Sequence, residues 1–364
     1  MCEQIVPNFN NFEHLHIGGL AYLQMEEEGK KKEKPKAVAL LSGGLDSTLA
    51  VKLMKEQGVD VKAVAIKTPF CDFDCGHGCG FRVKEVAEKL GVELKTFYLG
   101  DEYLEMLKNP KHGYGSGMNP CIDCREMMFK VAKDYMQEID AKFIITGEVL
   151  EQRPMSQNPR ALKIIEKESG LEGKVLRPLS AKHLPETEAE KTGLVHREQL
   201  LSIKGRTRKT QIELAKNFGI TDYPNSAGGC LLTDPQFARK VKDLFVHTEK
   251  PTLNDTELLK VGRHLRIADN TKLIVGRNKD ENDVLSSLAL PDDLLLEVKD
   301  HKGPVALLRG NFDENVMQLA SSIVHRYSDA PKDEKCVVTI KNNDISKEIS
   351  APSIDEEQLN SYRI

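Results

Sequence analysis

Residues 41–47 read LSGGLDS and have the composition of an anion-binding turn. They follow an apolar run and precede a helical pattern, so a buried strand is expected to lead into a tight turn that opens a helix. Backbone N–H groups of such a turn and the positive end of the helix converge on one spot, where an anion fits. Gly43 and Gly44 let the backbone approach that anion closely. The alternative interpretation is an ordinary surface turn that contains two glycines.

The side chains of the turn suit phosphate chemistry. Its two serines supply hydroxyl donors, and the carboxylate of Asp46 can hold a Mg²⁺ ion that neutralises phosphate charge. The turn lacks the Gly-Lys-Ser/Thr ending of a Walker loop. We therefore expect a pyrophosphate site, and with it ATP and Mg²⁺, at Ser42, Gly43, Gly44, Leu45, Asp46 and Ser47.

Eight cysteines narrow the chemistry further. Residues 1–30 lack the apolar core of a signal peptide, and no apolar stretch is long enough to span a membrane. A cytoplasmic chain is expected, in which thiols stay reduced and clustered cysteines indicate metal binding or catalysis before disulfides. Cys121 and Cys124 form a Cys-x-x-Cys at the start of an amphipathic helical pattern, where the helix N-terminus lowers thiol pKa values. Cys230 follows two glycines far downstream.

The SGGLDS turn resembles the PP-loop of the ATP pyrophosphatase superfamily, whose members cleave ATP to AMP and pyrophosphate. With the cysteines added, the pattern is similar to the tRNA thiolation enzymes of that class. The resemblance implies a [4Fe–4S] cluster held by three irons on Cys121, Cys124 and Cys230, with the fourth iron open for sulfide. Thiolate ligands suit such a cluster. A persulfide relay, a zinc site with one missing ligand and plain buried cysteines are the alternatives.

The resemblance also implies a function and further site residues. A tRNA uridine oxygen would be adenylated and then replaced by sulfur, which makes the chain an ATP-dependent tRNA sulfurtransferase. Its catalytic residues would be Asp46 and the three cysteines, and Gly147 would lie beside the adenosine. The implied partners are tRNA and a sulfur donor, either sulfide or a persulfide-carrying protein. A homodimer is left open, and so is the choice between 2-thio and 4-thio products.

A second cysteine group is not assigned. Cys71, Cys75 and Cys79 recur every four residues, with His77 among them. They follow the second apolar strand, at the sheet edge where doubly wound folds bind ligands. A zinc site, a redox pair and a loop without function all remain open.

The order of the elements predicts an α/β fold with a doubly wound parallel sheet, as in PP-loop and HUP-like Rossmann domains, followed by a smaller α+β domain. Strands are expected at 37–41, 61–66, 93–98 and 142–146, and helices at 47–57, 81–90 and 123–138. Residues 1–35 are expected to be an extended or disordered segment, 36–235 the PP-loop domain, 236–330 a second domain and 331–364 a tail. The aliphatic composition, without tryptophan, agrees with this class.

The net charge of −4 provides no global attraction to RNA, so local basic patches must hold it,. The densest run contains Lys204, Arg206, Arg208 and Lys209. Such a run matches contacts to tRNA or ATP phosphates, which position a substrate without reading its sequence. An ordinary solvated helix face is the alternative.

Residues 273–310 resemble the RNA-binding domain of NFACT-type proteins. The resemblance depends on Gly276, Arg277, Asn278, Asn282 and Leu285. The histidine that this family has in its second strand is absent, and Glu297 lies near that position. Arg277 is the main candidate for RNA contact, with Arg263, His264, Arg266 and Lys272 as further candidates.

Two rival functions remain. The first is a PP-loop enzyme that uses ammonia to amidate a small molecule or a deazapurine base and needs no tRNA. The second is a non-catalytic RNA-binding protein with a degenerate nucleotide domain, which would release no pyrophosphate. An intact SGGLDS turn disfavours the second.

Overall fold

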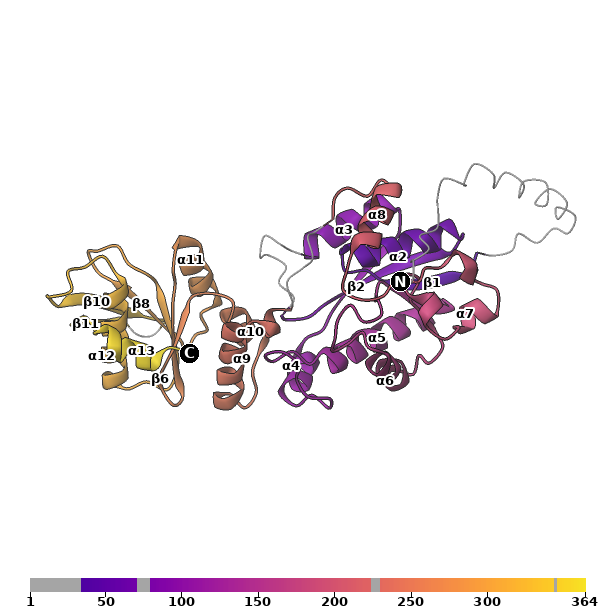
Figure 1. Cartoon of the computed structure of the whole chain (residues 1–364). Helices are drawn as coiled ribbons and strands as arrows, with labels where there is room; N and C mark the ends of the chain where they lie inside the picture. The colour runs from indigo at the N-terminus through magenta and orange to yellow at the C-terminus, as the bar shows by residue number, and fades with distance from the viewer. Residues whose placement is uncertain (1–33, 71–78, 224–229, 344–345) are drawn as a thin grey trace, which may run out of the picture.

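The computed structural model describes residues 34–70, 79–223, 230–343 and 346–364. The chain forms two lobes that lie side by side (Figure 1). The lobe at the N-terminal end contains a parallel sheet, and the lobe at the C-terminal end contains an antiparallel one. The second cysteine group lies outside the described residues, except that Cys79 begins a helix.

The first sheet has the strand order β3-β2-β1-β4-β5, and all of its pairs are parallel. This confirms the predicted fold class, and the four expected strands are displaced by no more than one residue at either end. β5 is a short fifth strand that the sequence pattern did not indicate. The strands are β1 (Lys36–Leu40), β2 (Asp60–Lys67), β3 (Leu94–Tyr98), β4 (Phe143–Thr146) and β5 (Val175–Leu176).

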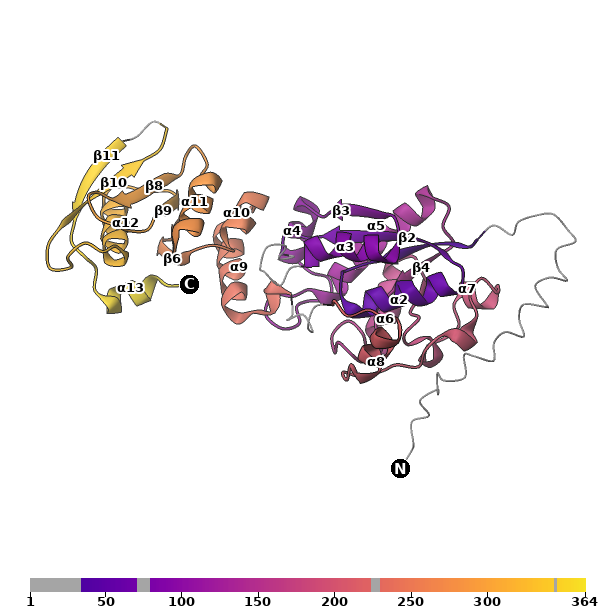
Figure 2. The ribbon, with the colours of Figure 1, turned by 90° about the horizontal axis from the view of Figure 1, so that it is seen from above.

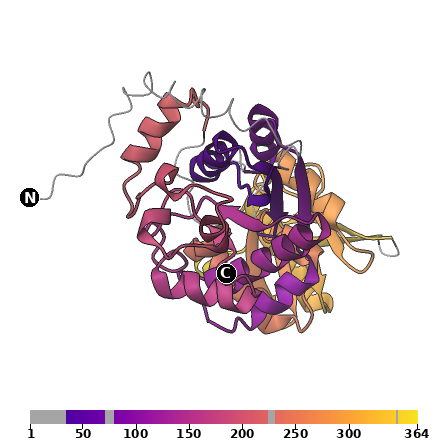
Figure 3. The same ribbon diagram turned by 90° about the vertical axis from the view of Figure 1, so that its right-hand side faces the viewer.

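Helices cover both faces of this sheet (Figure 3). Successive strand residues point to opposite faces, so Ala37 and Ala39 pack towards one side and Val38 towards the other,. The first side is covered by α2 (Leu45–Glu56), α3 (Cys79–Leu90) and α8 (Lys209–Asn217). The second is covered by α5 (Cys121–Glu138) and α6 (Pro159–Ser169). The fold also includes α4 (Asp101–Lys108) and α7 (Glu188–Lys191).

The second sheet is antiparallel, with the order β11-β10-β8-β9-β7-β6. Helix α12 (Glu314–Tyr327) packs on one face and α11 (Lys279–Leu288) on the other. The strands are β6 (Arg263–Ala268), β7 (Thr271–Val275), β8 (Leu294–Val298), β9 (Ala306–Gly310), β10 (Cys336–Lys341) and β11 (Ser346–Ala351).

The expected tail at 331–364 is wrong as a boundary. Strands β10 and β11 lie in the second sheet, because Val338 and Ile340 on one strand and Ile349 on the other are buried in its core. The final helix α13 (Glu356–Tyr362) adds Leu359 to the same core. Residues 331–364 are therefore part of the second domain.

Helices α9 (Pro235–His247) and α10 (Leu253–Leu258) lie between the two lobes (Figure 2). Phe237, Val241 and Leu244 of α9 share an apolar cluster with Leu104 and Leu107 of α4. The linking helix is thus packed onto the parallel-sheet lobe. None of the described helices has the length and hydropathy that a membrane crossing requires.

Candidate active site at the edge of the parallel sheet

The strand order of the first sheet reverses between β1 and β4, which are neighbours. Open parallel sheets bind ligands in the crevice outside the carboxyl ends of the strands at such a point. The SGGLDS turn follows β1, and the loop that begins at Gly147 follows β4. Both predicted nucleotide-binding segments therefore meet at this crevice.

The turn after β1 is held closed by its own serines. Gly43 has a φ of +75°, which L side chains rarely adopt,. The Ser47 hydroxyl donates to the Gly44 carbonyl at 2.9 Å and lies 3.1 Å from the Ser42 hydroxyl. Leu45 has a buried side chain, so only its backbone can face a ligand. The N-terminus of α2 thus opens at the crevice, as an anion site requires.

Gly147 lies directly against the first turn of helix α2. A Cβ at this position would lie 2.3 Å from the Ser47 nitrogen and 2.5 Å from the Asp46 carbonyl carbon. The resemblance implied that Gly147 lies beside the adenosine, where a side chain would clash with bound nucleotide. The structure gives a nearer reason, because the loop after β4 packs against the backbone of α2.

Asp46 is held from the loop after β4. The Gln152 Nε2 atom donates to Asp46 Oδ2 at 2.7 Å, and Gln211 Nε2 of α8 donates to Gln152 Oε1 at 3.0 Å. The second carboxylate oxygen, Asp46 Oδ1, is buried and has no hydrogen-bond partner within the described part of the chain. A buried orphan carboxylate oxygen next to an anion site fits a cation ligand such as Mg²⁺.

The three candidate cysteines come together from distant parts of the sequence. Cys121 and Cys124 occupy the first turn of α5, and Cys230 directly precedes the short helix η4 (Leu231–Thr233). The Met118 N–H donates to the Leu232 carbonyl at 2.8 Å, which ties the two segments together. Cys124 and Cys230 also pack against the same apolar cluster. All three thiols are half-buried.

The spacing of the sulfurs disfavours a single-ion site. A metal site needs ligand atoms that lie close together. Among the described residues, one group has all of its ligand atoms within 4.8 Å of one another, and it consists of His112, Glu126 and Glu168. The sulfurs of the three cysteines do not meet this criterion. Zn–S bonds of about 2.3 Å would place the sulfurs of a tetrahedral site about 3.8 Å apart. The three half-buried thiols are therefore not arranged as a ready-made zinc site.

Two arginines link the cysteines to the nucleotide loop. Burial raises the pKa of the Cys121 thiol, and the positive charges of Arg125 and Arg153 oppose this to a smaller extent. Desolvation lowers the pKa of Arg153, although part of its side chain reaches solvent. Cys121, Asp46 and Cys230 all oppose that shift. Arg153 therefore lies within electrostatic range of the nucleotide loop and of two of the three cysteines.

Arg125 was missed from the sequence, although its position contained a signal. It lies four residues after Cys121 and hence on the same face of α5,. Its Nη1 atom lies 3.6 Å from Oε1 of Glu148, a buried carboxylate that also accepts from Arg177 Nε at 2.9 Å. Arg177 is only 4% exposed, so it is a structural partner of Glu148 and not a surface phosphate contact.

The basic run lies beside the crevice. Gly205 N–H donates to the Leu150 carbonyl at 2.8 Å, which places the run next to the loop that contains Gln152 and Arg153. The half-buried Arg208 has an Nε atom without a partner within the described residues. The exposed cations of the run are Lys204, Arg206 and Lys209.

The further RNA candidates on the second sheet are mostly structural. Arg266 donates to both oxygens of Asp243 on α9, at 3.1 and 2.7 Å, and the Lys272 ammonium lies 3.2 Å from the same carboxylate. His264 is 4% exposed. Arg266 and Lys272 hold the second sheet against α9, and the buried His264 donates a hydrogen bond to the Val261 carbonyl. Arg277 is more exposed, although it also contacts Glu281 and the Gly262 carbonyl.

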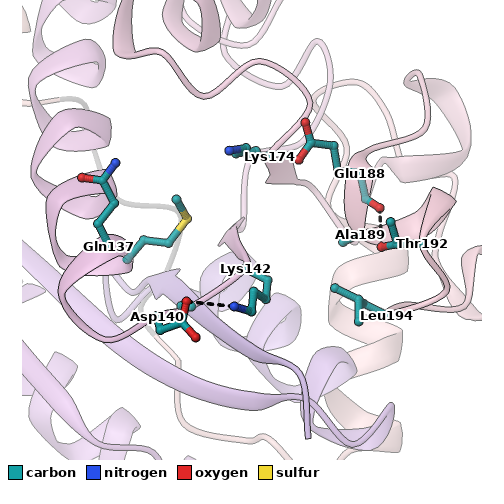
Figure 4. A pocket seen from close by; sticks show the side chains of 10 residues that line it. Gln137, Asp140, Lys142, Lys174, Glu188, Ala189, Thr192 and Leu194 are labelled. Carbon is teal, nitrogen blue, oxygen red and sulfur yellow. Dashed lines mark hydrogen bonds and ion pairs between the residues drawn. The ribbon is translucent and has the colours of Figure 1, made fainter. Parts of the chain in front are cut away.

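One further groove lies away from this site. It has a volume of about 490 Å³ and is lined by residues of α5, α7 and the starts of β4 and β5. Figure 4 shows Lys142, Lys174 and Glu188 in its wall. The starts of parallel strands lie at the edge opposite their carboxyl ends, so the groove is not part of the candidate site.

Comparisons with known proteins agree with this division of the chain. Residues 33–186 match the family model described as thiamine biosynthesis protein (ThiI), and residues 262–363 match the NFACT protein RNA binding domain. The chain is 25% identical over 293 residues to tRNA-specific 2-thiouridylase MnmA of Burkholderia vietnamiensis, covering 74% of this chain and 72% of that one. It is 27% identical over 250 residues to the protein of the same name from Acidovorax sp., covering 65% and 62%.

Solved structures with a looser likeness include a 4-thiouridine synthetase–RNA complex with bound ATP. That likeness has a TM-score of 0.35 at 21% identity, over 62% of this chain and 52% of the other. The U34-tRNA thiolase NcsA from Methanococcus maripaludis with its [4Fe-4S] cluster has a TM-score of 0.32 at 18% identity, over 63% and 71%.

Both resemblances predicted from the sequence are thus confirmed, and the NFACT match extends well beyond the forty residues that first indicated it. The chain joins a PP-loop domain of the ThiI family to an NFACT-type RNA-binding domain.

Proposed function

We propose that the protein is an ATP-dependent tRNA sulfurtransferase, which adenylates a uridine carbonyl oxygen and replaces that oxygen with sulfur. The observation that supports the proposal is that Arg153, in the loop after β4, lies within electrostatic range of Asp46 in the PP-loop and of Cys121 and Cys230. The names of the curated relatives, tRNA-specific 2-thiouridylases, support tRNA as the substrate.

The PP-loop side of the site serves adenylation. The N-terminus of α2 and the glycine turn would bind the pyrophosphate of ATP, and Asp46 Oδ1 would face the accompanying Mg²⁺,. When bound, the cation neutralises charge on the leaving pyrophosphate. Arg153, which lies within electrostatic range of Asp46 and Cys121, would stabilise charge on the α-phosphate as the uridine oxygen attacks. Positioning and electrostatic stabilisation account for most of such a step.

The cysteine side serves sulfur transfer. Cys121, Cys124 and Cys230 would hold a [4Fe–4S] cluster, for which three thiolates are a suitable donor set,. When bound, the cluster supplies an open iron for sulfide. Arg125 and Arg153 favour the thiolate form of Cys121 against the opposing effect of burial. A relay of persulfide between two of these cysteines is the cluster-free form of the proposal.

RNA would be held at two places. The exposed cations of the basic run lie next to the crevice and would contact tRNA phosphates close to the reacting base,. The NFACT-type domain would contact a more distant part of the RNA, and Arg277 is its exposed candidate.

Pyrophosphate release tests the proposal, with tRNA and sulfide supplied under anaerobic conditions. We expect release to require tRNA and to be lost in Asp46→Asn, which removes the charge that faces the cation. The control Asp134→Asn changes an exposed aspartate on α5 and should leave the rate unchanged. Release without tRNA, or equal rates for Asp46→Asn and its control, would overturn the proposal.

A further inference from the structure

We propose that Gln211 is a positioning residue of the nucleotide site, which fixes the orientation of the Asp46 carboxylate through Gln152. This inference rests on the proposed function, because it takes Asp46 to face the cation that accompanies ATP. It assigns a role to a residue that lies 165 positions after Asp46 in the sequence.

Gln211 has no exposed surface and lies in the first half of α8, which packs against α2. Its Nε2 atom donates to Gln152 Oε1 at 3.0 Å, and Gln152 Nε2 donates to Asp46 Oδ2 at 2.7 Å. The two amides therefore form a continuous chain of hydrogen bonds from the interior of α8 to the first turn of α2.

The direction of this chain follows from its acidic end. An ionised carboxylate can only accept hydrogen bonds, so Gln152 must turn its NH₂ group towards Asp46. Its carbonyl oxygen then faces Gln211, which must also present its NH₂ group. A chain of donors aligned in this way leaves no freedom to flip either amide.

The same alignment leaves a buried oxygen atom of Gln211 without a hydrogen bond to any described residue, and this cost indicates that the residue has a function. The Oε1 atom of Gln211 is buried and has no partner within the described residues. A leucine of similar volume would avoid that unsatisfied oxygen, so packing alone gives no reason for glutamine here. The reason lies in what the NH₂ group holds.

What the NH₂ group holds is Gln152, and Gln152 in turn holds Asp46 through Oδ2. With Oδ2 taken by Gln152, the buried Oδ1 has no partner in the described part of the chain and is the oxygen left for a ligand. Groups that orient a metal-binding side chain in this way usually change metal affinity by about 10- to 100-fold when they are removed.

Binding of Mn²⁺ with a non-hydrolysable ATP analogue tests this role, measured by electron paramagnetic resonance without turnover. Gln211→Leu should weaken Mn²⁺ binding by about 10- to 100-fold, while its melting temperature stays equal to that of the wild type or rises. The control Gln199→Leu, at an exposed position, should bind as the wild type does.

Gln211→Glu adds a readout that a purely structural residue would not give. Burial raises the pKa of the new carboxyl, and only its protonated form can donate to Gln152. Mn²⁺ affinity of this variant should therefore approach that of the wild type at low pH and fall as pH rises. An affinity with the same pH dependence as the wild type overturns the proposal.

The outcomes separate this inference from the proposed function. If Gln211→Leu binds Mn²⁺ as the wild type does while Asp46→Asn does not, the role of Gln211 is wrong and the nucleotide site stands. If the wild type itself does not bind Mn²⁺ with the analogue, or if Asp46→Asn binds it normally, both are overturned.

Discussion

Replacing Gly147 with alanine tests whether the contact between the two loops controls the site. The added Cβ would lie 2.3 Å from the Ser47 nitrogen, whereas ordinary contact begins at 3.4 Å. The loop after β4 must therefore move away from α2 by about 1 Å, since 3.4 − 2.3 = 1.1,. All three atoms nearest the Cβ belong to the backbone of Asp46 and Ser47, so no side chain can turn aside to relieve the clash.

Two quantities follow from that displacement. Overpacking of this kind costs about 1–3 kcal/mol of unfolding free energy. A shift of about 1 Å in a catalytic site lowers the rate by about 100-fold. We therefore expect Gly147→Ala to remain folded and to lose about 100-fold in kcat/KM for tRNA-dependent pyrophosphate release.

Gly58→Ala is the matched control. Gly58 has a φ of +79°, and nothing lies within 4 Å of its added Cβ. Its left-handed backbone makes alanine cost about 1–2 kcal/mol without touching the site. Urea unfolding and kinetics would be measured on both variants. The reasoning is refuted if both variants lose similar stability and Gly147→Ala keeps a kcat/KM close to that of Gly58→Ala.

Three further predictions concern the cysteines, the domain junction and the basic run. Cys230→Ser should abolish sulfur insertion but retain a single-turnover burst of pyrophosphate, because adenylation uses other residues. The control Cys336→Ser, in the distant second sheet, should retain both activities. Loss of the burst in Cys230→Ser alone would contradict the assignment of adenylation and sulfur transfer to different residues. Burial lowers the pKa of Lys272 to about 8, more than Asp243 can offset. The unfolded state therefore binds more protons between that value and the ordinary pKa of about 10.4, and Lys272 should contribute about 2 kcal/mol to a rise in unfolding free energy from about pH 7.5 to 9.5. In Lys272→Met, urea unfolding should show a smaller rise, and an unchanged slope would contradict the assignment. Alanine substitutions at Lys204, Arg206 and Lys209 should weaken tRNA binding at low salt. They should also reduce the salt dependence of binding by about one phosphate contact for each cation removed. Unchanged filter-binding curves would count against RNA contact at these residues.

Much of the fold could be predicted because the signals are local. Alternating apolar and helical runs placed four strands of the first sheet, and the SGGLDS turn located the crevice through its residue types alone. The boundary at 331–364 failed, because β10 and β11 pair with each other through a hairpin while only β10 pairs with β8. That second pairing is non-local, and no residue of the tail signals it.

The site divides in the same way. The turn and the Cys-x-x-Cys are short motifs, so their residue types could be read directly. Gln211 could not be found, since a single glutamine on an amphipathic helix has no distinguishing neighbours. The pairing of Arg266 and Lys272 with Asp243 could not be predicted either, because Asp243 lies on another element. Charge runs in a sequence do not reveal which cations are already paired.

Mass spectrometry of tRNA nucleosides tests the central proposal most directly. The protein, purified anaerobically, would be incubated with unmodified tRNA, ATP and sulfide, and the tRNA digested to nucleosides. We predict a uridine in which one oxygen is exchanged for sulfur, formed in proportion to pyrophosphate, and absent in Asp46→Asn and Cys230→Ser. Pyrophosphate release with unmodified nucleosides, or incorporation of nitrogen from ammonia instead of sulfur, would contradict the proposal.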